Sequence, residues 1–243
     1  MINENQIVPY QATELPAEEG PWLVFAPHAD DESFGMGGTL AKATARGIRV
    51  RLVVMTDGAL GGSQENLAEL RKAEAVKAAA VLGLEPPVFL DKRDRELKMD
   101  ADTLARVGAE IESLKPAAVF FPGPFELHPD HRATAVLVWQ ALGQLGPGAP
   151  IPFSYEILVQ SPVNTLVDIS AYTETKKAAM VLYQSQLEEN RYIDIALALN
   201  SLRTLTLPAG CTHAEGFYRY DQADLEQALP KIIADKIARL FQE

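Results

Sequence analysis

The sequence predicts an α/β protein in which helices cover both faces of a mainly parallel sheet. Short apolar segments of strand length alternate with longer segments of helical composition as far as residue 142, and such alternation is typical of parallel sheets. Two of the helical segments end before a glycine, a common helix stop. Hydrophobic residues make up 47% of the 243 positions, which is enough for a substantial core.

The first part of the pattern is the clearest. The continuous apolar run Trp22–Ala26 predicts a buried strand, and Phe34–Arg46 predicts the helix that follows it. Arg49–Met55 is rich in valine and predicts a second strand, whereas Asn66–Leu82 has the Ala, Leu, Glu and Lys content of a helix. The glycine-bearing segment Thr56–Ser63 between them is expected to be a loop. The alternation continues with a strand at Pro87–Leu90, a helix at Ala101–Leu114, a strand at Ala117–Phe121 and a helix at Arg132–Leu142.

The pattern is looser in the rest of the chain. We expect a strand at Phe153–Val159, mostly helix at Thr173–Leu207, a short strand at Gly216–Tyr220 and a final helix at Gln222–Phe241. The segment 143–152 is rich in glycine and proline, but its length of about ten residues is that of a loop rather than a domain linker. We therefore expect one domain over residues 1–243, with residues 1–20 as a polar leader.

The composition excludes several classes of function. A net charge of −11 repels phosphodiester backbones and attracts divalent cations, so we expect no nucleic-acid partner. No apolar run approaches the roughly 20 residues of a membrane span, and the first residues lack the basic and apolar parts of a signal peptide. The single cysteine, Cys211, cannot form an internal disulfide. These features predict a cytoplasmic protein without a membrane partner.

Histidines and carboxylates are concentrated in two short clusters. His28-Ala29-Asp30-Asp31-Glu32 directly follows the first predicted strand, and His128-Pro129-Asp130-His131 comes soon after the fourth. Together they hold three of the four histidines. Ligands of parallel α/β sheets gather at the carboxyl ends of the strands. If the first and fourth strands are neighbours, the two clusters form one site.

The residue types in these clusters are those of a catalytic zinc site. A catalytic zinc ion is typically held by two imidazoles and one carboxylate, with positions left for water and substrate. The ion lowers the pKa of its bound water to ~7. His28, Asp31 and His131 can supply this set. Asp30 lies beside one ligand and is placed to accept the proton of that water. A single His–Asp pair is more often a hydrogen bond than a ligand set, but the two clusters together favour the metal site.

The second cluster offers a further catalytic group. His128 can stabilise the oxyanion that forms when hydroxide adds to a carbonyl, and then protonate the departing amine. Asp130 either orients His128 or caps the helix that begins at Arg132.

At these positions the chain resembles the LmbE-like or PIG-L family of zinc-dependent N-deacetylases. The family signature is a Pro-His-Pro-Asp-Asp-Glu element and a later His-Pro-Asp-His element, and this chain has Pro27–Glu32 and His128–His131 in their places. The resemblance implies a Rossmann-like, three-layer α/β/α sandwich. It also implies the following roles: zinc ligands His28, Asp31 and His131, general base Asp30, and acid or oxyanion stabiliser His128.

The chain departs from the family pattern at two positions. Ala29 stands where most members have proline, which frees one backbone φ angle but removes no ligand. Glu126 stands where deacetylases of the mycothiol pathway have a tyrosine, which argues against a mycothiol-type function. Arg71, Asp94 and Glu126 are the candidate substrate-binding residues, although Arg71 on a helix of charged residues would by itself be a solvated charge.

Two other features are expected to lie outside the chemistry. Gly35, Gly37 and Gly38 lack the spacing of a dinucleotide-binding fingerprint, so we expect them to serve close helix packing. His213 is expected to be a surface or core histidine.

The resemblance implies a small amino-sugar substrate. The expected reaction is removal of the N-acetyl group from an N-acetylglucosamine-type sugar or its glycoside, by attack of metal-bound hydroxide on the amide. Zn²⁺ is the expected cofactor, with Fe²⁺ or another divalent ion as the alternative. Two other functions stay open: a broader N-acyl or thiol-conjugate amidase, and a non-catalytic sugar- or metal-binding module. A homo-oligomer is compatible with the resemblance.

Overall fold

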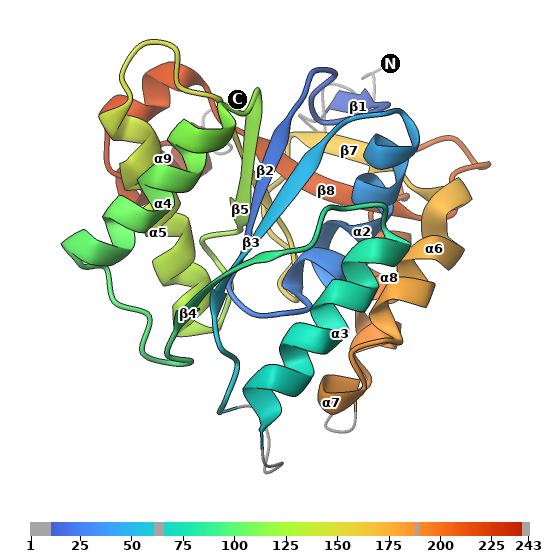
Figure 1. Cartoon of the computed structure of the whole chain (residues 1–243). Helices are drawn as coiled ribbons and strands as arrows, with labels where there is room; N and C mark the ends of the chain where they lie inside the picture. The colour runs from blue at the N-terminus through green and yellow to red at the C-terminus, as the bar shows by residue number, and fades with distance from the viewer. Residues whose placement is uncertain (1–10, 61–65, 188–189, 240–243) are drawn as a thin grey trace.

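One mainly parallel sheet forms the centre of the molecule. The computed structural model describes residues 11–60, 66–187 and 190–239, and its eight-stranded sheet has the order β1-β7-β8-β6-β5-β2-β3-β4 (Figure 1). β8 is antiparallel to β6 and β7, and the other pairs are parallel. The strands are β1 Gln11–Thr13, β2 Trp22–Ala26, β3 Val50–Thr56, β4 Val88–Lys92, β5 Ala118–Pro122, β6 Ile151–Tyr155, β7 Thr165–Asp168 and β8 Ala214–Arg219.

Helices cover both faces of this sheet. Figure 1 shows α4, α5 and α9 on one face and α2, α3, α6 and α8 on the other. The helices are α2 Asp31–Ala45, α3 Leu67–Val81, α4 Ala101–Leu114, α5 Pro129–Gln144, α6 Thr173–Met180, α7 Gln184–Leu187, α8 Tyr192–Leu202 and α9 Leu229–Arg239, with 3₁₀ turns η1 Ser170–Tyr172 and η2 Gln222–Glu226.

Each central strand sends alternate side chains into two separate cores. In β2, Trp22 and Val24 join the core that includes residues of α2 and α3, whereas Leu23 and Phe25 join the core that includes residues of α4 and α5. Successive side chains of a strand point to opposite faces, so a strand buried on both faces needs a continuous apolar run. The arrangement confirms the predicted three-layer α/β/α sandwich.

Helix α2 lies close to its neighbours because glycines without side chains stand at the points of contact. A Cβ atom at Gly35 would lie 2.6 Å from the carbonyl oxygen of Glu156, and one at Gly38 would lie 2.7 Å from the side chain of Ile169. Real Cβ atoms do not approach other atoms this closely. These glycines therefore serve helix packing, as the sequence indicated.

Several predicted elements differ from those observed. The strand predicted at Phe153–Val159 is observed earlier in the chain, as β6, which ends at Tyr155. The amides of Ile157 and Leu158 donate to the side chain of Glu126 instead of to another strand. The predicted helix Thr173–Leu207 is divided into α6, α7 and α8, and residues 188–189 in it lie outside the described ranges. Strand β7 has no counterpart in the prediction, since its four residues carry too little periodicity to be recognised.

The two ends of the chain also differ from expectation. The predicted final helix Gln222–Phe241 is interrupted after η2. Pro230 lacks a backbone N–H and therefore suits the first turn of a new helix, α9. Residues 240–241 of the predicted helix, 61–63 of the predicted loop and 1–10 of the predicted leader lie outside the described residues, and β1 occupies part of the leader.

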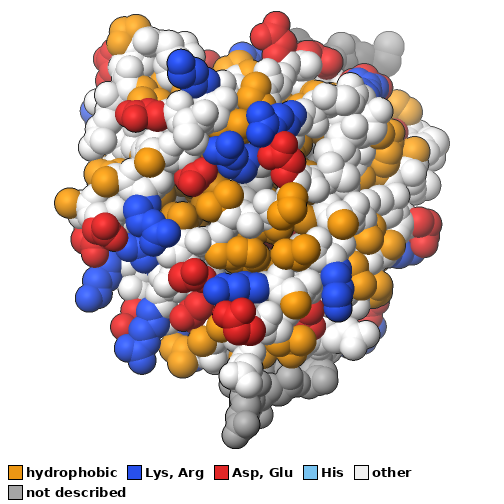
Figure 2. All heavy atoms as spheres, in the orientation of Figure 1, with side chains coloured by type: hydrophobic (Ala, Val, Ile, Leu, Met, Phe, Trp, Pro, Cys, Tyr) orange, Lys and Arg blue, Asp and Glu red, His pale blue; other side chains and the backbone are white. Residues whose placement is uncertain are grey.

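The surface carries mixed charges. In the orientation of Figure 2, basic side chains lie beside acidic ones and between apolar ones rather than forming one extended patch. Paired examples include Arg49 with Glu85 and Lys92 with Asp102. Of the helices that the structure describes, none combines the length and apolarity needed to cross a membrane.

Candidate metal and catalytic site

The two polar clusters meet at the carboxyl edge of the sheet. β2 and β5 are parallel neighbours, with Trp22 opposite Ala118 and Val24 opposite Phe120, and β3 lies on the other side of β2. The chain therefore continues from β2 to one side and later returns to the other. Parallel α/β sheets bind ligands at such a switch point. The predicted adjacency of the first and fourth predicted strands is confirmed.

The turn after β2 has an unusual backbone. Asp30 has a φ angle of 145°, a value that residues other than glycine rarely adopt. The turn is held by Thr56, whose amide and hydroxyl donate to the carbonyl of Pro27 at 3.0 Å and 2.9 Å. The side-chain amide of Gln186 donates to the carbonyl of Ala29. Strained residues persist where the surroundings over-determine them, and they cluster at functional sites.

The three predicted metal ligands lie close together. Oδ2 of Asp31 lies 3.2 Å from Nδ1 of His28 and 3.3 Å from Nε2 of His131. Ligand atoms of a tetrahedral zinc site lie about 2.0–2.2 Å from the metal, and hence about 3.4 Å from one another. All three residues are at most 9% exposed. Two imidazole nitrogens thus approach one carboxylate oxygen, but the groups of described residues whose donor atoms all lie within 4.8 Å of one another contain both His28 and His128 and do not contain Asp31.

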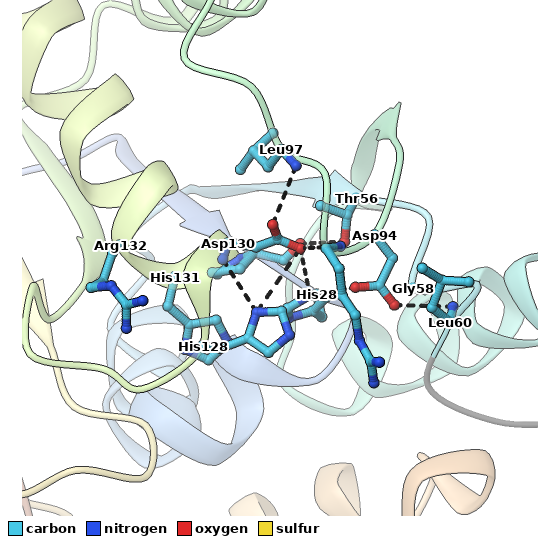
Figure 3. Close-up of polar contacts among 12 residues, drawn as sticks. His28, Thr56, Gly58, Leu60, Asp94, Leu97, His128, Asp130, His131 and Arg132 are labelled. Atoms are coloured by element: carbon cyan, nitrogen blue, oxygen red, sulfur yellow. Dashed lines mark hydrogen bonds and ion pairs between the residues drawn. The ribbon is translucent and has the colours of Figure 1, made fainter.

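His28 also contacts carboxylates through its other ring nitrogen. Its Nε2 lies 3.2 Å from Oδ1 of Asp94 and 3.3 Å from Oδ2 of Asp130, and Figure 3 shows these groups together. Donor atoms of His28, Asp94, His128 and Asp130 lie within 4.8 Å of one another, as do those of His28, His128 and His131. A carboxylate that accepts the second N–H of a ligating histidine orients the ring. Asp94 and Asp130 occupy that position if Nδ1 of His28 holds the metal.

Without a bound cation, the carboxylates favour charged imidazoles. Burial opposes protonation of His28, but hydrogen bonds to the carboxylates of Asp130 and Asp31 outweigh it and hold the pKa of His28 well above its usual value. Burial also opposes protonation of His131, yet the charge of Asp31 raises the pKa of His131 to about 9. The site therefore attracts positive charge, which a metal ion would supply.

Asp30 differs from its neighbour in its electrostatic setting. Its side chain lines the pocket, and the residue is 8% exposed. Burial and the adjacent charge of Asp31 hold the pKa of Asp30 well above its usual value. A general base works best when its pKa is near the working pH, so this environment suits proton transfer.

His128 combines a structural contact with an exposed edge. It is the N-cap residue of α5, and its Nδ1 accepts a hydrogen bond from the amide of Asp130 at 3.2 Å. In a neutral ring that accepts through Nδ1, the proton is on Nε2. The ring meets that of His28 edge to face at a centroid distance of 4.6 Å. Burial and the neighbouring His28 lower the pKa of His128, which keeps the ring neutral.

Asp130 does not orient His128 in the way that the sequence suggested. Its Oδ2 lies 3.9 Å from Nδ1 of His128, too far for a hydrogen bond. The carboxylate instead accepts from the amide of Arg95 at 2.7 Å and from the amide of Leu97 at 3.3 Å, besides facing His28 (Figure 3). The reason is the loop after β4, whose amides reach the carboxylate directly. Asp130 therefore connects that loop to His28.

The pocket above these groups holds about 170 Å³. Its polar lining includes two of the three predicted substrate-binding residues, Arg71 and Asp94. Arg71 donates to the carbonyl of Gly58 at 2.6 Å. Asp94 accepts from the amide of Leu60 at 3.0 Å; burial opposes its ionisation, but the hydrogen bond from His28 lowers the pKa of Asp94 to about 2.

Glu126, the third predicted substrate-binding residue, does not line this pocket. It is only 1% exposed, and its Oε1 accepts from the amides of Ile157, Leu158 and Val159 at 2.9, 3.2 and 3.3 Å. Its position behind the pocket wall does not match a direct contact with substrate. His213 does not line the pocket either.

Other lining residues were not predicted from their types. Gln186 and Tyr192 line the pocket and come from the later part of the chain, where the pattern was looser. Phe34, Ile157 and Leu158 carry no signal that separates a pocket wall from a core, and Arg95 stands in a charged loop like many surface arginines. Only the tertiary structure brings these residues to the site.

Comparison with known proteins gives concordant matches. The family model described as PIG-L, GlcNAc-PI de-N-acetylase, matches residues 23–142. Diacetylchitobiose deacetylase of Thermococcus kodakarensis is 31% identical over 219 residues, covering 80% of this chain and 80% of that protein. A probable N-acetyl-α-D-glucosaminyl L-malate deacetylase 2 of Bacillus anthracis is 29% identical, covering 68% of this chain and 80% of the relative.

A solved structure agrees with these matches. The N,N′-diacetylchitobiose deacetylase from Pyrococcus horikoshii has a TM-score of 0.76 with this chain, at 26% sequence identity, and 86% of each chain is covered. Because 86% of the chain is covered, the similarity extends beyond residues 23–142.

Proposed function

The chain belongs to the PIG-L family, and from this premise we propose that it is a metal-dependent hydrolase that removes the N-acetyl group from an N-acetylglucosamine-type sugar or its glycoside. One observation carries the proposal. The carboxylate of Asp31 lies between nitrogens of His28 and His131, beside Asp30 and His128 in one pocket. The named relatives support the substrate class, since they are deacetylases of diacetylchitobiose and of an N-acetylglucosaminyl malate.

We assign the metal to His28, Asp31 and His131, and we propose Zn²⁺ as the ion, with Fe²⁺ as the alternative. When bound, the ion would supply Lewis acidity to the attacking water and the amide carbonyl. Asp94 and Asp130 face the other nitrogen of His28 and would keep its ring in the orientation that the metal needs.

Asp30 is the proposed general base. It lines the pocket next to Asp31, and its raised pKa suits a group that accepts a proton from water. Addition of that water to the amide carbon makes the carbonyl oxygen negative. Asp30 then passes that proton to the leaving nitrogen, so that its carboxylate ends in its starting state.

His128 is the proposed partner of the developing oxyanion. Because its Nδ1 accepts the amide of Asp130, its Nε2–H is available to donate to the carbonyl oxygen. Cleavage of the C–N bond also requires a proton on nitrogen, and Asp30 supplies the one that it took from water, while the neutral ring of His128 keeps its N–H on the oxyanion. The products are acetate and the free amine. Arg71 and Asp94 are the proposed contacts to polar groups of the sugar.

A chelation and reconstitution experiment tests this function. The purified protein is stripped of metal, supplied with Zn²⁺ or Fe²⁺, and incubated with N-acetylglucosamine, diacetylchitobiose, and the malate and inositol glycosides of N-acetylglucosamine. We expect release of acetate from at least one sugar only after metal is restored. Tight sugar binding without release of acetate would instead identify a binding module.

The apolar part of the pocket makes a broader amidase the second candidate. Phe34, Ile157, Leu158 and Tyr192 line the pocket beside the polar groups, and such side chains can accept an acyl chain longer than acetyl. A series of N-acyl glucosamines with increasing chain length separates the two functions. A steep fall in kcat/KM beyond acetyl supports the deacetylase, and similar values across the series support the broader amidase.

A further inference from the structure

Glu126 connects the pocket wall to a metal-binding histidine. It is 1% exposed, and the guanidinium of Arg132 donates to the backbone carbonyls of Glu126 and Leu127 at 2.8 Å and 2.6 Å. These hydrogen bonds fix the backbone from which the side chain of Glu126 extends.

The first carboxylate oxygen organises a loop. Oε1 accepts from three successive amides, those of Ile157, Leu158 and Val159, at 2.9 to 3.3 Å. These amides follow the end of β6, where the sheet no longer pairs them. Successive N–H groups that point to one place form a site for an anion. Ile157 and Leu158 line the pocket, so Glu126 sets the position of that wall.

The second carboxylate oxygen faces His131. Oε2 lies 3.7 Å from Nδ1 of His131, which is longer than a hydrogen bond but places a negative charge beside that nitrogen, while Nε2 of the same ring lies 3.3 Å from Asp31. Within the described part of the chain, this buried Nδ1 has no hydrogen bond, and Glu126 carries the carboxylate nearest to it among the ion pairs of His131. A carboxylate beside one ring nitrogen of a metal-binding histidine favours the proton on that nitrogen.

We propose that Glu126 is a positioning residue: it keeps the proton of His131 on Nδ1, which directs the lone pair of Nε2 toward the metal, and it holds the pocket wall at Ile157–Val159 through the same side chain. This inference rests on the proposed function for its catalytic meaning. It replaces the substrate contact that the sequence suggested for Glu126. It also predicts that metal binding and order in the 157–159 segment are coupled, and such coupling is reciprocal.

Glu126→Gln tests the proposal, because the amide keeps an acceptor oxygen for the three backbone N–H groups but carries no negative charge. The variant therefore loses the charge beside Nδ1 of His131. We expect Zn²⁺ to bind about 10–100-fold more weakly, as for other residues that orient metal ligands. The measurement is a titration of the metal-free protein with Zn²⁺ against a competing chelator. Asp168→Asn is the matched control, since Asp168 accepts from the amide of Ser170 at 2.8 Å and does not line the pocket.

Two measurements on the unmodified protein keep the proposal testable if Glu126→Gln does not fold. ¹⁵N spectroscopy of the Zn²⁺-loaded protein should find the proton of His131 on Nδ1 and the metal on Nε2. Hydrogen exchange should slow at the amides of Ile157–Val159 when Zn²⁺ is added, and it should not change at Ser170, whose amide is bonded to Asp168.

Specific outcomes would overturn the inference. Metal bound through Nδ1 of His131 would do so, as would wild-type Zn²⁺ affinity in Glu126→Gln. A variant with unchanged Zn²⁺ affinity and a raised KM alone would restore the substrate contact. These readouts do not depend on acetate release, so a protein that binds Zn²⁺ as expected but hydrolyses no amide would refute the proposed function and leave the role of Glu126 supported.

Discussion

Nε2 of His131 lies 3.3 Å from Oδ2 of Asp31, although the two residues come from different helices, α5 and α2. Each residue stands in the first turn of its helix, and each of these helices follows a different strand, β2 or β5. This contact joins the two polar clusters into one site. Charge, burial and spacing at this contact determine how the site should respond to mutation and pH.

Replacement of Asp30 should separate metal binding from turnover. Asp30→Asn removes the proposed base but none of the three proposed ligands, so we expect a full complement of Zn²⁺ and a kcat lower by about 10²–10⁴-fold.

His131→Ala should lose both metal and activity, because it removes a ligand. Metal analysis and acetate release measure the two effects. Asp102→Asn is the control, since that carboxylate is exposed and paired with Lys92. An active Asp30→Asn enzyme would show that another group is the base.

Replacement of His128 by asparagine should preserve the stability of the fold but lower the rate of the reaction. Asparagine is a good N-cap residue and can replace the acceptor that His128 offers to the amide of Asp130. His128→Asn should therefore keep wild-type thermal stability, while kcat falls about 10²–10³-fold through loss of the N–H donor. His128→Ala should lose activity and also about 1 kcal/mol of stability, because the cap is gone. Equal kcat in His128→Asn and wild type would exclude the proposed donor.

Zn²⁺ affinity should increase with pH. The raised pKa of His131, about 9, means that the ring is protonated at neutral pH in the metal-free protein. The metal must displace that proton and also the proton of His28, whose pKa is raised as well, so affinity should rise by at least about tenfold per pH unit until the pH reaches these pKa values. Competition titrations over a pH series measure this slope. A flat profile would mean that the ring is already neutral.

The raised pKa of His131 should also make the stability of the metal-free protein depend on pH. His131 has a higher pKa in the folded protein than the ordinary value of 6.5, so its protonation stabilises the metal-free fold fully below pH 6.5. This contribution is lost as the pH rises through about 9. Chemical denaturation of metal-free wild type and His131→Asn over this range should differ in slope, and identical slopes would contradict the shift.

Lys176 should be the more important of two adjacent lysines. Its Nζ is fully buried, 2.6 Å from Glu215, which also accepts from the amides of Gly38 and Thr39 beyond the kink of α2 at Met36. Lys176→Met leaves Glu215 buried without its cation, and we expect a loss of about 3–5 kcal/mol in the free energy of unfolding.

The neighbouring Lys177 supplies the control for that loss. It pairs with Glu174 at the surface, where both side chains are exposed. Lys177→Met should change the free energy of unfolding by no more than about 1 kcal/mol. Similar losses in both variants, measured by urea denaturation, would mean that the buried pair does not stabilise the fold.

Local sequence patterns were sufficient for the central strands and for the two clusters. Trp22–Ala26 and Ala117–Phe121 are continuous apolar runs, and a strand buried on both faces requires such a run. Polar residues that soon follow such runs lie at the sheet edge, so His28 and His131 could be placed in one site from the sequence. Later segments were harder to predict, because short strands such as β7 obtain their stability from pairing partners that lie far away in sequence.

The sequence by itself determined which chemical groups this protein brings to the sheet edge and at which strand ends they stand. The tertiary structure alone decided what each group contacts. Asp130 accepts hydrogen bonds from the amides of Arg95 and Leu97, and Glu126 accepts them from the amides of Ile157–Val159. The physical reason is that backbone N–H groups have no sequence signature, yet a buried carboxylate must find such donors. Which donors it finds depends on loops that only the folded chain brings within reach.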